Sequence, residues 1–144
     1  MGISDLDIMS GIERQTFSKN ERLCSTKLIE EIFESGNVLY TPQFKVVWII
    51  SSVSLPSPAQ IAVSVPKKII RLAVTRNLIK RRIREAYRKI KQPFYSFLVS
   101  ENIPITFIMI YRHRSPADFE TIEKSVGEVI EKLKNDIKQK RKIC

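Results

Sequence analysis

The feature that most limits how this chain can fold is an amphipathic basic segment in its middle. Between Lys67 and Lys91 lie eleven of the 25 basic residues and a single acid, Glu85, so this segment alone carries the formal net charge of +10. From Thr75 to about Lys91, apolar residues recur at helical spacing, while Arg and Lys recur every four residues on another side. We therefore expect a helix that packs one face on a core and keeps a cationic face at the surface.

A stripe of one charge sign indicates a polyanionic partner. Like charges four residues apart on a helix repel by roughly 0.2–0.5 kcal/mol per pair. A stripe kept despite this repulsion favours nucleic acid, because each phosphate neutralised by Lys or Arg releases condensed counterions. The expected contacts to phosphates are Lys67, Lys68, Arg76, Lys80, Arg81, Arg84 and Arg88. Asn77 has two open roles: it could cap the helix or hydrogen-bond the backbone of the preceding loop, or it could donate to a ribose or phosphate.

The rest of the chain predicts a single α+β domain over residues 17–137, between an N-terminal tail (1–16) and a basic C-terminal tail (138–144). We expect Phe44 and Trp48 to lie in the core, and the wetter face of their strand to carry Lys45 and Val47. Pro93 is expected just beyond the basic helix, and Ser115 and Pro116 should open the last helix. The remaining expected elements are a helix over 25–35 capped by Ser25 and ended by Gly36, strands over 44–53 and 60–65 paired as a hairpin, and a strand over 103–111.

Several classes of protein are disfavoured by what the sequence lacks. Cys24 and Cys144 form neither a disulfide framework nor a metal motif, which favours a reduced, cytoplasmic setting. No signal peptide or membrane-spanning run is recognisable. His113 lies between Arg112 and Arg114 with no acid or nucleophile motif near it, so it is expected at the surface. No phosphate-binding loop, zinc motif or nucleophile elbow is present, and we assign no catalytic residue and no metal ligand.

The order of residues in the basic segment is more specific than its charge. Val63–Lys68, then Ala73–Asn77, Lys80-Arg81 and Arg84-Glu85, resembles the RNR signature of the protein subunit of bacterial ribonuclease P. Upstream, the run from Phe17 to Leu23, followed by Ile29, Phe33 and Gly36, is similar to the opening of that family. The chain departs from the family at three places: Ile29 where many members have phenylalanine, Pro66 for a common serine, and Ile70-Arg71 for a glycine-containing pair.

The resemblance implies an α/β sandwich with a central mixed sheet and an unusual left-handed βαβ crossover. It implies an accessory subunit of an endoribonuclease that removes the 5′ leader from precursor tRNA, in which the RNA subunit is the catalyst and requires Mg²⁺. The protein itself would bind no cofactor, would be inactive alone and monomeric, and would have the catalytic RNA and precursor tRNA as partners. The leader would lie between the sheet and the first helix, with Phe17, Ile29, Phe33, Lys45 and Val47 as candidate contacts.

Three alternatives fit the charge alone. One is a ribosome-associated RNA-binding protein or RNA chaperone without a role in cleavage. Another is a helix-turn-helix DNA regulator, although a strand directly before the basic helix fits that motif poorly. The last is a helix for an acidic membrane or a calmodulin-like partner, which is disfavoured because its apolar face lacks large exposed anchors.

Overall fold

The computed structural model describes the backbone of residues 19–143 and the side chains of residues 19–140, so Phe17 and the tail over 1–16 lie outside the described residues. The α+β class is confirmed. In chain order the elements are η1 (Lys19–Glu21), α2 (Thr26–Ser35), β1 (Asn37–Tyr40), β2 (Phe44–Ile50), β3 (Ala59–Ser64), α3 (Ala73–Glu101), β4 (Ile105–Tyr111) and α4 (Phe119–Ile143).

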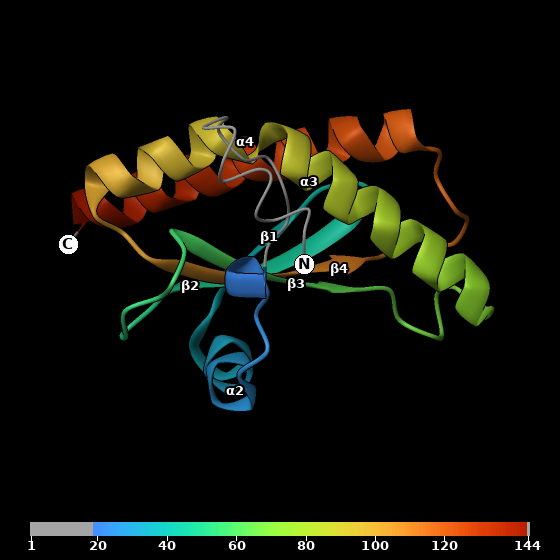
Figure 1. Cartoon of the computed structure of the whole chain (residues 1–144), viewed down its shortest axis with the longest axis horizontal. Helices are drawn as coiled ribbons and strands as arrows, with labels where there is room; N and C mark the ends of the chain where they lie inside the picture. The colour runs from blue at the N-terminus through green and yellow to red at the C-terminus, as the bar shows by residue number, and fades with distance from the viewer. Residues whose placement is uncertain (1–18, 144) are drawn as a thin grey trace, which may run out of the picture.

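The elements form three layers: the pair α3 and α4, one mixed sheet, and α2 (Figure 1). The described strands are ordered β1-β2-β4-β3, with β1–β2 and β2–β4 antiparallel and β3–β4 parallel. Figure 1 shows α3 and α4 across one face of the sheet and α2 beneath the other. The parallel strands β3 and β4 are joined through α3, which gives the βαβ unit that the resemblance implies; the handedness of this crossover stays a prediction.

The expected hairpin between the strands over 44–53 and 60–65 is wrong. β2 pairs instead with β1, a strand that sequence reasoning missed, and β4 lies between β2 and β3. The physical reason is burial: nearly every residue of β4 is buried, as expected for a strand covered on both faces, and such a strand takes a central place in the sheet.

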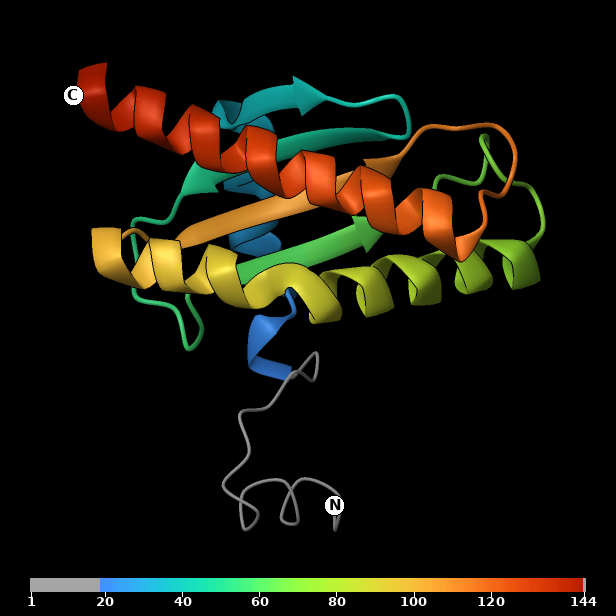
Figure 2. The same ribbon diagram turned by 90° about the horizontal axis from the view of Figure 1, so that it is seen from above.

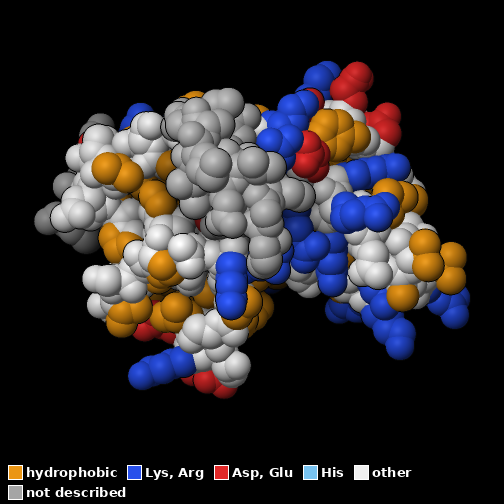
Figure 3. Space-filling model, in the orientation of Figure 1, with side chains coloured by type: hydrophobic (Ala, Val, Ile, Leu, Met, Phe, Trp, Pro, Cys, Tyr) orange, Lys and Arg blue, Asp and Glu red, His pale blue; other side chains and the backbone are white. Residues whose placement is uncertain are grey.

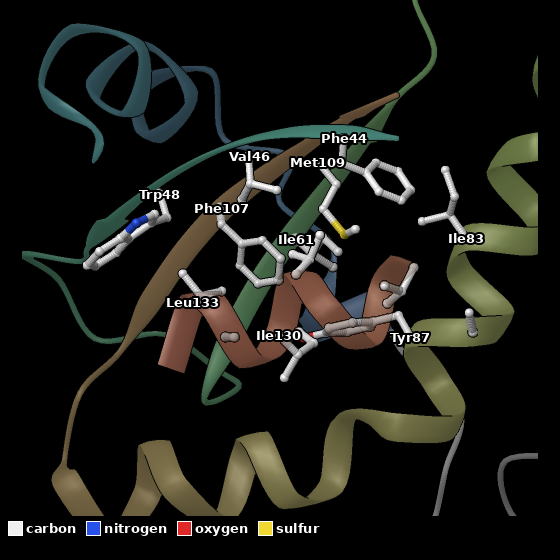
Figure 4. Close-up of a cluster of buried hydrophobic side chains, with 14 of the residues drawn as sticks. Phe44, Val46, Trp48, Ile61, Ile83, Tyr87, Phe107, Met109, Ile130 and Leu133 are labelled. Carbon is white, nitrogen blue, oxygen red and sulfur yellow. The ribbon is translucent and has the colours of Figure 1, made fainter. Parts of the chain in front are cut away.

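The main core lies between the sheet and the pair α3 and α4. Phe44 and Trp48 are buried there, as predicted, and Trp48 is opposite Phe107 of β4. Figure 4 shows Phe107 directed from the sheet toward Leu133 and Ile130 of α4, and Phe44 directed toward Ile83 of α3. The predicted apolar face of α4 is buried at Ile122, Val126, Val129, Ile130, Leu133 and Ile137, while Phe119 is partly buried.

A second, smaller core joins α2 to the other face of the sheet. It consists of Leu23, Ile32, Val47 and Ile108, with Ile29 packed against it. Ser25 caps α2 as predicted, its hydroxyl accepting a bond from the backbone N–H of Leu28 at 3.3 Å. Gly36 ends the helix as predicted. A glycine suits this position because the Cβ of any other residue would lie 2.3 Å from the Ile32 carbonyl oxygen.

α3 does not end before Pro93 as expected; it continues to Glu101. A proline inside a helix removes one backbone hydrogen bond and bends the helix. The two turns beyond Pro93 bury Phe94 and Leu98 in the main core, and this burial outweighs the lost bond. Figure 2 shows α3 running along the molecule beside α4. Asn102 then ends α3 in the left-handed conformation, at φ 57°.

The bounds of α4 also differ from the expectation. Asp118, not Ser115, caps it: the Asp118 carboxylate accepts the backbone N–H of Thr121 at 2.8 Å. The Ser115 carbonyl instead accepts the hydroxyl of Tyr111 at 2.7 Å, which keeps residues 115–117 outside the helix. Since α4 extends through Ile143, residues 138–143 belong to this helix and do not form a separate tail.

Candidate RNA interface

The loop between β3 and α3 presents Lys67 and Lys68 to solvent. The loop is anchored by Ile70, which is buried, and by backbone bonds from Ile69 and Ile70 to the carbonyl of Pro66. Leu72 occupies the cap position of α3 and supplies no side-chain cap. The two lysines therefore stand on a fixed turn at the start of the basic helix.

Arg76 holds this turn in place. Its Nη1 donates to the carbonyl oxygens of Ile70 at 3.1 Å and Arg71 at 2.8 Å. Arg76 thus makes the hydrogen bonds to the backbone of the preceding loop that the sequence left open as one role for Asn77. The contact of Arg76 with a phosphate stays a prediction. Asn77 lies within α3, is exposed, and its side chain hydrogen-bonds no described residue, which leaves it open to a partner.

The cations of the segment from 67 to 91 divide into two groups. In the part of the chain that the structure describes, six have side chains with no hydrogen bond or ion pair: Lys67, Lys68, Arg71, Lys80, Arg81 and Arg84. We call these the free cations. Figure 3 shows Lys and Arg side chains gathered around the end of the molecule where α3 begins. Arg71 was not among the predicted contacts because it lies outside the helical spacing.

The other basic side chains of this segment are engaged within the protein. Arg88, a predicted contact, is bound by Glu85, with Nε to Oε1 at 3.1 Å, and this bond holds the pKa of the Glu85 carboxyl below its ordinary value. Lys89 pairs with Glu123 at 3.1 Å. Arg82 donates to the carbonyl of Ala117 at 2.6 Å. The sequence stripe alone does not distinguish these cations from the free ones.

Lys91 is the extreme case. It is buried and pairs with Glu21 at 2.6 Å, and Glu21 also accepts the hydroxyl of Tyr95 at 2.6 Å. Burial and the bond to Glu21 raise the pKa of Tyr95 well above its ordinary value. This pair fastens η1 to α3, so Lys91 is part of the interior although the sequence places it in the basic segment.

The face of the sheet covered by α2 holds the candidate leader contacts. Phe33 is 60% exposed on α2, Ile29 is partly buried, and Lys45 is partly exposed on β2. Val47 is only 4% exposed beneath α2, so its predicted contact with a leader is wrong for this arrangement of the helix.

Sequence reasoning missed one residue pair on this same face. Tyr40 is opposite Lys45 in the β1–β2 register and is half exposed, and the Arg112 guanidinium lies 4.9 Å from the centre of its ring. The β-branched Val38 and the aromatic Tyr40 are residue types enriched in strands, and they are the signal that could have revealed β1. His113 is exposed, as predicted, and its ring nitrogen is 3.1 Å from the Ser115 hydroxyl.

Two absences hold for the described residues. They contain no group of three or more His, Cys, Asp or Glu side chains that could hold a metal ion. Among their helices, none combines the length and the hydropathy needed to cross a bilayer.

The fold and this surface define a class: a single-domain α+β protein with a cationic helix face suited to a phosphate backbone. The sequence model of the family described as Ribonuclease P matches residues 17–134. The chain therefore belongs to the ribonuclease P protein family. The alternative of a ribosome-associated protein or chaperone is not supported by this match.

Individual relatives agree with the family. The chain is 30% identical to the ribonuclease P protein component of Porphyromonas gingivalis over 120 residues, covering 83% of this chain and 88% of the relative. It is 30% identical to that of Chlorobium phaeobacteroides over 139 residues, with coverages of 89% and 94%. A solved structure of a mutant Staphylococcus aureus RNase P protein superposes with a TM-score of 0.67 at 23% identity, covering 91% and 96%, and shows the shared fold.

Proposed function

We propose that this chain, as the protein component of ribonuclease P, docks on the catalytic RNA through the six free cations. The observation that supports this most directly is that none of the six has a partner among the described residues, whereas the other cations of the same segment are engaged. A cation that is already paired with a carboxylate adds little free energy when it binds a phosphate. A solvated cation that neutralises a phosphate releases the counterion that the phosphate had condensed, and this release favours binding. Lys offers a point charge and Arg a bidentate fork to the backbone.

A second surface would hold the 5′ leader of precursor tRNA. Phe33, Lys45 and Tyr40 come from α2 and from neighbouring strands on the face that α2 covers. Exposed rings beside a cation suit single-stranded RNA, because each base can stack on an aromatic face while its phosphate meets the charge. Ile29, near the N-terminal end of α2, would contribute an apolar contact. The protein would thus contact the catalytic RNA and the leader with different parts of its surface.

The chemistry of cleavage would belong to the RNA subunit and its Mg²⁺. The polypeptide would act by raising affinity for precursor tRNA and by neutralising phosphates that repel one another when two RNAs meet. We expect it to act as a monomer in the bacterial cytoplasm.

The test is cleavage of the leader from a precursor tRNA by the cognate catalytic RNA at low Mg²⁺, with and without the protein. The expected result is faster cleavage or tighter substrate binding with the protein, and no cleavage by the protein alone. A variant with Phe33→Ala and Tyr40→Ala should lose affinity for a precursor with a leader but keep affinity for mature tRNA. The absence of any effect of the parent on cleavage, despite tight RNA binding, would refute the proposal.

A further inference from the structure

The turn before α3 borders an open hollow that combines charge with exposed apolar surface. Lys67, Lys68, Arg71 and Leu72 line a space of about 620 Å³. Leu72 is 70% exposed, one of the two highest values among the large hydrophobic side chains of the described residues; the other, Val74 at 82%, does not line the hollow. Figure 3 shows hydrophobic side chains among Lys and Arg at this end of the molecule.

This apolar edge is held by the fold. Ile70 is buried in the main core, and Arg76 binds the carbonyl oxygens of Ile70 and Arg71, directly before Leu72. Leu72 then occupies the position directly before a helix of 29 residues. Because the turn is fixed on both sides, the exposed side chain keeps a defined position relative to the three cations.

The chemistry of the hollow selects its occupant. The three cations favour an anion, and none of them has an internal ion pair among the described residues. The outside of an RNA duplex offers phosphate and sugar, because its bases are stacked inside, and would leave Leu72 against polar groups. An unpaired nucleotide offers phosphates and an apolar base face together.

We propose that this hollow binds one unpaired nucleotide of an RNA partner. Lys67, Lys68 and Arg71 would hold the phosphates on either side of the nucleotide, and the base would lie against Leu72, the apolar side chain that lines the hollow. The inference rests on the proposed docking of RNA on the free cations and goes beyond it, because phosphate contacts alone do not distinguish paired from unpaired RNA.

The test compares two RNA hairpins that are identical except for one bulged nucleotide. The parent protein should bind the bulged hairpin about three- to tenfold more tightly, a preference at the low end of measured base stacking because the contacts are aliphatic. The variant Leu72→Ser should bind both hairpins equally and keep the parent's affinity for the paired one. Val99→Ser, which changes an exposed valine near the other end of α3, should keep the preference.

A second measurement does not depend on the variants. With 5-iodouridine at the bulge, irradiation should crosslink the RNA to the peptide containing residues 67–74. Equal binding of both hairpins by the parent with a steep salt dependence, or crosslinks only to other peptides, would overturn the nucleotide site and leave the docking surface intact. Failure of the parent to bind either hairpin would overturn both.

Discussion

Removing three free cations should change the salt dependence of RNA binding by a predictable amount. The variant is Lys80→Gln, Arg81→Gln, Arg84→Gln, in which none of the replaced side chains has a partner within the described part of the chain. Since these side chains support no contact of the core, the fold should stay intact. The matched control is Lys89→Gln on the same helix, where the lysine is paired with Glu123.

The magnitude follows from the number of free cations. Six contacts at about 0.7–0.9 each give a slope of log affinity against log salt of roughly −4 to −5. The triple variant should show a slope of about −2 to −3, and at about 0.15 M salt its affinity should be lower by roughly 100-fold. The control should keep the slope of the parent.

Glu85 provides a test in the opposite direction. Glu85→Gln removes the single acid of the segment from 67 to 91, so the positive charge of this segment rises and its affinity for RNA should increase, most of all at low salt. The assay is a titration of the catalytic RNA, with fluorescence anisotropy, at several salt concentrations for parent and variants. A triple variant with the slope of the parent, or a control that loses as much slope as the triple variant, would refute the division into free and engaged cations.

Three further predictions concern the fold that supports this surface. Glu21→Gln should lower the free energy of unfolding by about 3–5 kcal/mol, because it removes the charge of the carboxylate that pairs with the buried Lys91 ammonium. Urea denaturation measures this, and a loss near zero would contradict it. Gly36→Ala should lower the free energy of unfolding by about 1–3 kcal/mol, because its Cβ would lie 2.3 Å from a carbonyl oxygen. Gly127→Ala, with open space around it, should be neutral or stabilise α4 by about 0.5–1 kcal/mol in the same assay. Because the pKa of Tyr95 is raised, the folded state keeps a proton that the unfolded chain loses near pH 10. The contribution of this group to stability should therefore be complete below that pH and fall as the pH rises above it. Urea midpoints that do not differ on either side of pH 10 would contradict this.

Local patterns in the sequence were sufficient for the existence of α2, α3 and α4 and for their buried faces, but not for every helix end. The cap at Ser25 and the buried face of α4 were predicted correctly because they depend on residues within a few positions of one another. The end of α3 was predicted wrongly because a proline is a local signal for a helix end, whereas the burial of Phe94 and Leu98 depends on the sheet beneath them.

The candidate site shows the same division. The sequence predicted the basic stripe, but it could not tell that Arg88 is bound by Glu85 while Arg84 is free, since both fit the same spacing. It also grouped Val47 with Lys45, although α2 covers one and leaves the other partly open. Exposure on a strand face depends on which helix packs there, and no spacing within the strand records that.

The sequence by itself therefore determined where the charge excess lies and which helical residues face the core, because residues three and four positions apart lie on the same face of a helix. The tertiary structure decided the strand order β1-β2-β4-β3, the burial of Lys91 with Glu21, and the six cations left for a partner. Each of these depends on contacts between residues far apart in the chain. Such contacts form only when the layers pack together.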